Sequence, residues 1–370
     1  MRPDNEGFLY PEASDACIHC GLCEKVCPSF LPKPENNRHI QRAVGAVAKD
    51  NAIWRRSTSG GAFSEICRVW ADDNTLIVGA AWVGLKVHHI GVTGFDNIAP
   101  LCKSKYLSSE IGDTFIEIKS ALTDGRKVIF CGCPCQVAGL KAFLARTYDS
   151  LLTIDLICHG QGSPRVFEAC VRNLSKQFGD EIKAYMFRAK RKWYEEDYIT
   201  CIRTSKTLIY LKNDPYVQLF LSQNALRPSC GENCKYRNPS RPGDITIADL
   251  KGLSTLFPDL QHSRKNWSTI VCNTRKGGEC VESLIKTMVI RPITIEDVVK
   301  FNPLFAKQTW FSKDRGVFFS DFEVDADKAI SKWTVPAIVH NPGFVRRTYY
   351  VLPKWIKKRL SAISQSLRCQ

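Results

Sequence analysis

The chain has 370 residues, 44% of them hydrophobic, and a formal net charge of +15. Its length exceeds the size at which single hydrophobic cores stop growing, so two or more domains are expected. No apolar stretch approaches the roughly eighteen residues of a membrane-spanning helix, and the polar N-terminus lacks a signal-peptide pattern. Basic residues are spread along the chain without a nucleic-acid recognition motif. We therefore expect a cytoplasmic protein, binding no nucleic acid, whose 17 cysteines stay reduced.

The first element in chain order is a cysteine-rich run. Cys17, Cys20, Cys23 and Cys27 have the spacing C-x2-C-x2-C-x3-C and precede Pro28, which is the ligand pattern of a bacterial-type iron–sulfur cluster. Zinc sites use separated C-x2-C pairs, so zinc fits this continuous run poorly. The run predicts a small ferredoxin-like 4Fe–4S module over residues 1–35.

The sequence does not identify the fourth ligand of this cluster. In two-cluster ferredoxins the fourth cysteine of such a run ligates the other cluster, and the chain has no second run. Cys17, Cys20 and Cys23 are therefore expected as three ligands. The candidates for the fourth are the adjacent Cys27 and the distant Cys133, Cys135, Cys230 and Cys234.

Strand and helix signals then alternate, which predicts an α/β core over residues 43–180. The expected strands span residues 76–83, 128–131 and 151–157, and the expected helices span 62–70, 114–123, 136–144 and 164–178. From residue 181 to 295 the pattern indicates a β-rich insertion and further strands, at residues 184–188, 198–203, 207–211, 244–249 and 268–273, before a helix over 279–286.

Residues 296–370 form a basic C-terminal extension. Near its end, basic and aromatic or apolar residues interleave: Phe344, Arg346, Arg347, Tyr349, Tyr350, Lys354, Trp355, Ile356, Lys357, Lys358, Arg359 and Leu360. Such a segment fits peripheral contact with an anionic membrane, or the amphipathic last helix of a globular domain.

Four loops carry candidate binding residues. Ser57, Thr58, Ser59, Gly60 and Gly61 precede a helix and could cradle a phosphate, although Ser and Thr are also ordinary helix caps. Lys103 and Lys105 could form a cationic clamp for a phosphate or a flavin, and the alternative is that they are ordinary lysines solvated at the surface. Two further loops each follow an apolar strand: Gly132-Cys-Pro134-Cys-Gln136 and Cys158-His159-Gly160. Each could be a functional loop, and the alternative is buried cysteines beside turn glycines.

Taken in order, these segments resemble the coenzyme F-420 hydrogenase/dehydrogenase beta-subunit family. The matching pieces are residues 6–11, the cysteine run, residues 57–61, 104–106, 134–140, 155–160, 187–188, 227–230 and 241–249. The chain departs from the family in three places. It has one cysteine run instead of two, either as a one-cluster variant or because its start lies too late, and it carries Cys133 before Pro134 and Leu250-Lys-Gly252 after Asp249.

The resemblance implies an iron–sulfur flavoprotein oxidoreductase that relays electrons between a 4Fe–4S cluster and FAD. The implied flavin-binding residues are Ser57, Thr58, Ser59, Gly60, Gly61, Lys105, Gly132, Pro134, Gln136 and Gly160. His159 is the best proton donor by its chemistry and Cys158 lies beside it, while the alternative for His159 is a strand-end histidine bonded to the backbone.

The expected partners are a small organic substrate, coenzyme F-420 or another, and an acidic electron carrier such as ferredoxin, which the positive charge would suit. One alternative is an electron-transfer subunit without its own substrate, docked on a catalytic partner. Another is a degenerate scaffold that binds the cluster without redox activity.

Overall fold

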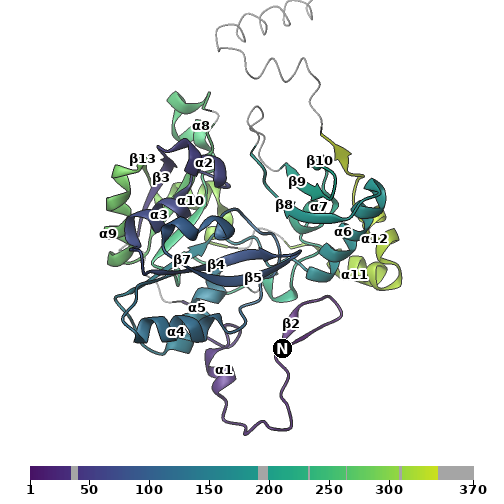
Figure 1. The fold of residues 1–370 in the computed structure, drawn as a ribbon, viewed down its shortest axis with the longest axis horizontal. Helices are drawn as coiled ribbons and strands as arrows, with labels where there is room; N and C mark the ends of the chain where they lie inside the picture. Colours follow the sequence, from purple (N-terminus) through teal and green to yellow (C-terminus); the bar gives the residue numbers. More distant parts are fainter. Residues whose placement is uncertain (35–40, 191–198, 232–233, 264, 308–310, 341–370) are drawn as a thin grey trace, which may run out of the picture.

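The computed structural model describes residues 1–34, 41–190, 199–231, 234–263, 265–307 and 311–340. Within these ranges, the centre of the molecule is an eight-stranded mixed sheet with the order β13-β3-β12-β11-β7-β6-β4-β5 (Figure 1). Its strands are β3 (Arg42–Ala48), β4 (Leu76–Val83), β5 (Lys86–Thr93), β6 (Val128–Gly132), β7 (Leu151–Leu156), β11 (Ile245–Asp249), β12 (Ser268–Cys272) and β13 (Met288–Ile293).

The directions of these strands create one functional edge. Strands β4, β6, β7 and β11 are parallel neighbours. Strand β12 is antiparallel both to β11 and to β3, so β3 points the same way as the parallel group. The loops that follow β3, β6, β7 and β11 therefore leave the sheet at the same edge, where ligands bind in open α/β sheets.

Both faces of the sheet are covered, as the uninterrupted apolar sequence of β6 requires. Ile129 packs into one core, whereas its neighbours Val128 and Phe130 point into the other, because successive side chains of a strand alternate between faces. The helices that accompany the two cores are α3 (Ala62–Trp70) and α9 (Arg275–Ser283) on the Ile129 side, and α4 (Thr114–Thr123) and α5 (Pro134–Leu144) on the other.

A second, antiparallel sheet has the order β14-β10-β9-β8 and lies beside the large one (Figure 1). Its core is rich in aromatic rings, among them Phe167, Tyr185, Phe187, Tyr216 and Phe220. The elements around this core are β8 (Ile182–Met186), β9 (Thr200–Thr204), β10 (Leu208–Lys212), β14 (Ile338–Val339), α6 (Pro164–Phe178), α7 (Pro215–Leu221), α11 (Arg315–Val324) and α12 (Ala326–Trp333).

The N-terminal segment contributes a short strand pair and one short helix. Strand β1 (Arg2–Pro3) pairs with β2 (Leu9–Tyr10), and α1 (Leu22–Val26) lies beneath α5 in Figure 1. The remaining α-helices are α2 (Asn51–Arg56), α8 (Leu253–Leu256) and α10 (Ile295–Phe301), and the 3-10 turns are η2 (Phe95–Asn97), η3 (Ala99–Leu101), η4 (Pro228–Cys230), η5 (Pro258–Leu260), η6 (Leu284–Lys286) and η7 (Pro303–Phe305).

The predicted α/β core is confirmed in its coarse form, a mixed α/β fold around a large sheet. Helices α4 and α6 have the predicted bounds, and α5 begins two residues early because Pro134 fits the first turn of a helix. Strand β3 was not predicted, since its Ala- and Gly-rich sequence lacks the bulky residues typical of strands. No helix among the described residues is long and apolar enough to cross a membrane, and the basic segment at residues 341–370 lies outside them.

Candidate functional site

Three of the predicted loops leave the sheet at its carboxyl edge. Ser57–Gly61 follows β3 and α2, Gly132–Gln136 follows β6, and Cys158–Gly160 follows β7. Residues that are distant in sequence therefore meet there, and two groups can be distinguished. One is a set of thiols, and the other is a loop rich in hydroxyl groups.

The thiols of Cys133, Cys135, Cys158, Cys230 and Cys234 form what we call the core thiol site. The Sγ atoms of Cys133 and Cys158 are 3.6 Å apart. Gln161 joins the other side of the site, with its backbone N 3.4 Å from the Cys230 Sγ and its Nε2 3.9 Å from the Cys135 Sγ. Cys234 is near enough to Cys135 and Cys230 for its charge to raise the pKa of both thiols, after burial. All five cysteines are partly buried and free of disulfides.

Two buried arginines give the core thiol site a positive environment. Arg237 donates from Nη2 to the His159 carbonyl (2.6 Å), while its buried Nε has no hydrogen-bond partner. Arg241 is paired with buried Asp155, with an Nη2–Oδ1 distance of 2.9 Å. The hydrogen bond between the Cys133 and Cys158 thiols lowers the pKa of Cys158 to about 7, and the two arginines act in the same direction. Thiolates, alone or bound to iron, carry the negative charge that such an environment favours.

A chain of hydrogen bonds positions Cys133. The backbone N of Cys133 donates to Gln136 Oε1 (2.8 Å), whose Nε2 donates to Ser109 Oγ (3.0 Å). Ser109 Oγ lies 3.0 Å from His89 Nδ1, and His89 Nε2 lies 3.3 Å from the Cys131 carbonyl. Burial lowers the pKa of His89 to about 4, so the ring is neutral at pH 7, donates from Nε2 and accepts at Nδ1.

His159, the predicted proton donor, is bonded to the backbone. Its Nε2 lies 3.1 Å from the Phe220 carbonyl, and the ring is tilted against Phe220 with centroids 5.0 Å apart. Burial lowers its pKa to about 4, so His159 is neutral at pH 7. The role of His159 as a proton donor stays a prediction.

The hydroxyl-rich loop Ser57–Gly61 makes hydrogen bonds with three other segments of the chain. Ser59 Oγ donates to the Trp267 carbonyl (2.6 Å), and Ser104 N donates to Thr58 Oγ1 (2.8 Å). Lys190 Nζ donates to the Ser59 carbonyl (2.7 Å) from the chain that follows β8. Gly60 is required because a Cβ atom there would lie 2.3 Å from the Ala46 carbonyl oxygen.

The start of α3 and Lys105 provide donors that fit a phosphate group. The N-cap of α3 is Gly61, at φ 99°, so no side chain caps the first N–H groups of the helix. Lys105 Nζ donates to the carbonyls of Pro100 and Cys102, which leaves one of its three hydrogens for another acceptor. Burial lowers the pKa of Lys105 to about 8.

The predicted cysteine ligands at the N-terminus lie on the surface. Cys17, Cys20 and Cys23 are exposed and Cys27 is partly buried. Among the described residues, no three His, Cys, Asp or Glu side chains lie close enough to hold a single metal ion. The four cysteine sulfurs that hold a cubane lie further apart than the ligands of a single metal ion, and the C-x2-C-x2-C-x3-C spacing of this run fits that requirement.

Sequence reasoning missed the core thiol site as a unit. Cys133, Cys135, Cys230 and Cys234 entered only as alternatives for one ligand position, and Arg237 and His89 were not singled out. Two sequence features could have predicted the site: cysteines at the ends of two apolar strands, and the C-x3-C pair at Cys230 and Cys234.

Comparison with known proteins identifies the segment that contains this site. Residues 125–298 match the family model described as the C terminus of the coenzyme F420 hydrogenase/dehydrogenase beta subunit. The chain is similar to this beta-subunit family over that segment, which is just under half of its length. The predicted family is thus confirmed, and the matched residues include the five thiols, both arginines and strands β6, β7, β11 and β12.

Structural comparison returns a chain of the F420-reducing [NiFe] hydrogenase complex from Methanosarcina barkeri. It is 17% identical with a TM-score of 0.46, over 71% of this chain and 84% of that chain. No curated protein matches the sequence.

Proposed function

We propose that the chain is a cytoplasmic iron–sulfur flavoprotein oxidoreductase. The observation that carries this proposal is the core thiol site, in which five thiols from distant loops meet beside a buried arginine nitrogen without a partner. Five converging thiols without a disulfide are the donor set of an iron–sulfur cluster, and similarity to a family of hydrogenase and dehydrogenase subunits supports redox chemistry.

Four thiolates hold a 4Fe–4S cluster, so one of the five thiols is left over. We assign Cys133, Cys135, Cys230 and Cys234 to the cluster. Cys158 remains with its neighbour His159 as the proposed proton-handling pair, at the carboxyl end of β7. A second 4Fe–4S cluster is proposed in the ferredoxin-like module of residues 1–35, on Cys17, Cys20, Cys23 and Cys27.

FAD is the proposed second cofactor. Ser57, Thr58, Ser59, Gly60, Gly61 and Lys105 would hold its phosphates, and Gly132, Pro134, Gln136 and Gly160 would shape the pocket beside the thiols. When bound, the flavin supplies two-electron chemistry and the clusters supply one-electron chemistry. The protein contributes the phosphate donors at the start of α3 and the positive environment around the thiols.

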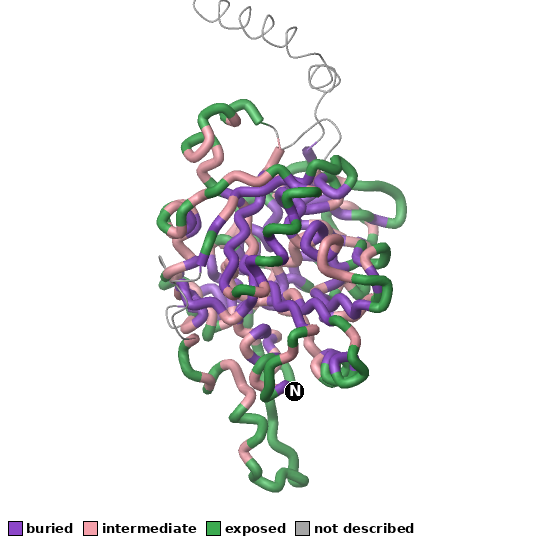
Figure 2. Tube along the Cα trace, turned by 90° about the vertical axis from the view of Figure 1, so that its left-hand side faces the viewer, coloured by how far each residue is buried: buried purple, intermediate pink, exposed green. Residues whose placement is uncertain are grey.

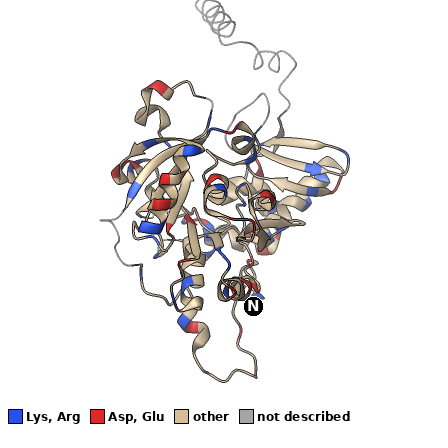
Figure 3. Ribbon diagram, turned by 60° about the vertical axis from the view of Figure 1, so that its left-hand side comes forward, with Lys and Arg blue, Asp and Glu red and all other residues tan. Residues whose placement is uncertain are grey.

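The proposed partners are a small organic substrate and an acidic electron carrier. The net charge of +15 supports a general attraction to anions, and basic and acidic residues are interspersed along the ribbon in Figure 3. The relative named above belongs to a hydrogenase complex, so a catalytic partner subunit is the second proposal for what this chain docks against.

Anaerobic purification followed by iron, sulfide and flavin quantification tests the proposal. We expect about eight irons per chain for two cubanes, and one FAD. Iron without flavin would favour the electron-transfer subunit without its own substrate. A chain that contains neither iron nor flavin after anaerobic reconstitution would contradict the proposal.

Serine variants test the assignment of the ligands. Cys230→Ser should lose about half of the iron, whereas Cys158→Ser should keep it and lose turnover, because the proposal leaves Cys158 outside the cluster. Equal iron loss in the two variants would show that Cys158 is a ligand.

A further inference from the structure

The base of the N-terminal cysteine run is anchored to the body of the molecule. Tyr236 donates its hydroxyl to the Pro28 carbonyl (2.9 Å), and Lys235 donates from Nζ to the Ser29 carbonyl (2.9 Å) and to the Leu31 carbonyl. Both donors directly follow Cys234, a member of the core thiol site. The anchor therefore belongs to the same loop as one of the five thiols.

A packing contact with α5 reinforces this anchor. The ring of Pro28 lies so close to Gly139 that a Cβ atom there would be 3.1 Å from Pro28 Cγ. Gly139 is buried and follows Cys135 by four residues, so the two share one face of α5. The base of the run thus touches the helix face that carries a second thiol of the core thiol site.

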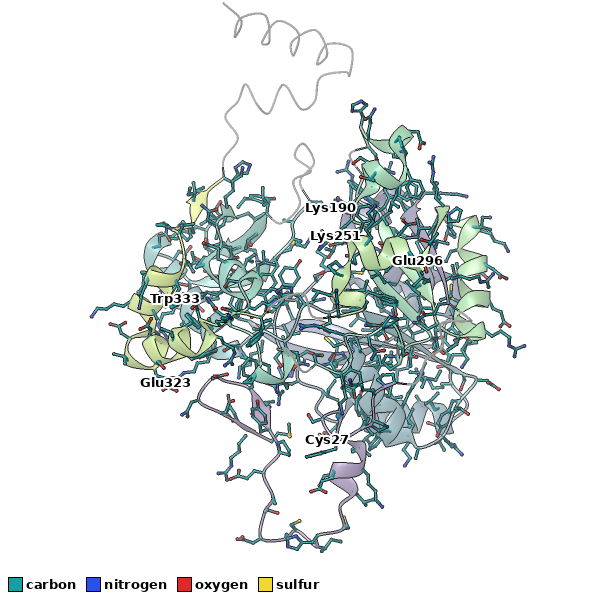
Figure 4. All side chains as sticks on the ribbon, turned by 180° about the vertical axis from the view of Figure 1, so that it is seen from behind. Cys27, Lys190, Lys251, Glu296, Glu323 and Trp333 are labelled. Carbon is teal, nitrogen blue, oxygen red and sulfur yellow. The ribbon has the colours of Figure 1, made fainter. Side chains whose placement is uncertain are left out.

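The tip of the run faces outward. Cys17, Cys20 and Cys23 are exposed, and so are the apolar side chains Ile18 (82%) and Leu22 (62%). Figure 2 shows this segment as an exposed loop that projects from the body. Figure 4 labels Cys27 at the end of α1 that is nearer the body. The run therefore has an exposed tip and a docked base.

Tyr236 lies between the base of the run and the core thiols. Its hydroxyl donates to the Pro28 carbonyl (2.9 Å), and its own carbonyl accepts from Arg241 Nη1 (3.1 Å). Tyr236 thus contacts both the base of the run and one of the two buried arginines beside the core thiol site.

We propose that Lys235, Tyr236 and Gly139 are positioning residues that dock the base of the N-terminal cysteine run beside the core thiol site. The two sulfur sites then lie in series, with the tip turned toward a redox partner. This inference rests on the proposed function for its purpose, but the docking itself is a property of the chain's own residues.

The test uses the full chain, loaded anaerobically, with the double substitution Lys235→Met and Tyr236→Phe. These changes remove three hydrogen bonds and keep the bulk of both side chains. Tyr148→Phe is the matched control, because the Tyr148 hydroxyl makes no hydrogen bond to any residue that the structure describes. Amide hydrogen exchange of residues 22–31 should become about ten-fold faster in the double variant and stay unchanged in the control. Amides of α5 serve as the internal reference for intact folding.

A second readout separates the docking from the proposed function. With both sites loaded, iron content should match the parent, while magnetic interaction between the two reduced clusters should weaken in the double variant. Absence of iron from the parent would overturn the proposed function and leave the exchange test valid. Unchanged exchange over residues 22–31, with α5 intact, would overturn the docking.

Gly139→Val provides an independent variant if the double substitution fails to fold. Its side chain pushes Pro28 away without removing a hydrogen bond, and it should also accelerate exchange over residues 22–31. Exchange at the parental rate in a folded Gly139→Val chain would contradict the role of this contact.

Discussion

At the scale of single residues, a network of hydrogen bonds holds the backbone of Cys133. Gln136, Ser109 and His89 form one connected network that ends at the Cys131 carbonyl, two residues before Cys133. Each member is buried or partly buried, so a lost partner leaves a polar group without compensation from water.

Ser109→Ala should therefore destabilise the fold by about 1–3 kcal/mol, because it removes the shared partner of Gln136 and His89. Urea unfolding measures this change. Ser283→Ala is the control, since the Ser283 hydroxyl bonds the Glu279 carbonyl at an exposed position and should cost less than about 0.5 kcal/mol. Equal effects of the two substitutions would contradict the network.

The same histidine makes stability depend on pH. Because burial holds the pKa of His89 at about 4, against an ordinary value of 6.5, the unfolded chain binds the proton first as the pH falls. Stability is therefore complete above pH 6.5 and decreases between pH 6.5 and 4, by up to about 3 kcal/mol for this group. Lys105 is the charged group that acts on His89, and it lowers the pKa further.

Urea unfolding from pH 7 to pH 4 should show a smaller decrease for His89→Gln than for the parent. The comparison between parent and variant removes the contribution of other titrating groups, including His159. Identical slopes in the two proteins would show that His89 is protonated as easily in the folded chain as in the unfolded one.

At the scale of elements, one buried ion pair joins two strands and the loop that carries Arg237. Asp155, in β7, accepts from Arg241, from Gly243 N (2.9 Å) and from Thr246 Oγ1 (2.7 Å) in β11. Arg241 also donates to the Tyr236 carbonyl (3.1 Å). The pair thereby sets the position of the segment between Cys234 and β11 relative to the sheet.

Arg241→Met should destabilise the fold by about 3–5 kcal/mol, because it leaves the Asp155 carboxylate buried without its counter-ion. Arg291→Met tests the same chemistry at the surface. Arg291 makes two hydrogen bonds with Asp259, of 2.7 and 2.6 Å, but both side chains are exposed to solvent, so we expect a much smaller loss than for Arg241→Met. Chemical denaturation of both variants gives the comparison, and similar losses would refute the role of burial.

At the scale of the whole molecule, the core thiol site joins parts of the chain that meet only in the folded state. Its thiols come from the loops after β6 and β7 and from the segment before β11, whereas the N-terminal run is local in sequence. The proposed cluster on the core thiols would therefore bind the native state and not the unfolded chain, which would couple loading to stability.

Anaerobic iron–sulfur reconstitution should raise the Tm by several degrees in the parent and in Cys17→Ser. The increase should be lost in Cys230→Ser, because only the core thiols connect distant elements. Differential scanning calorimetry under anaerobic conditions provides the measurement. A Tm increase that depends on Cys17 and not on Cys230 would reverse this assignment.

The sequence by itself determined the α/β character of the core, the helices α4 and α6 and the resemblance to the family, because strand runs, helical periodicity and motif spacing are local properties. It also identified the loops at residues 57–61, 132–136 and 158–160. Only the tertiary structure decided which of those loops meet, since that depends on strand order and direction in the sheet. The grouping of Cys133 and Cys158 with Cys230 and Cys234, the buried Arg237 and the docking of Pro28 on Gly139 all join residues far apart in the chain. Long-range contacts of this kind arise from packing, which no local pattern in the sequence encodes.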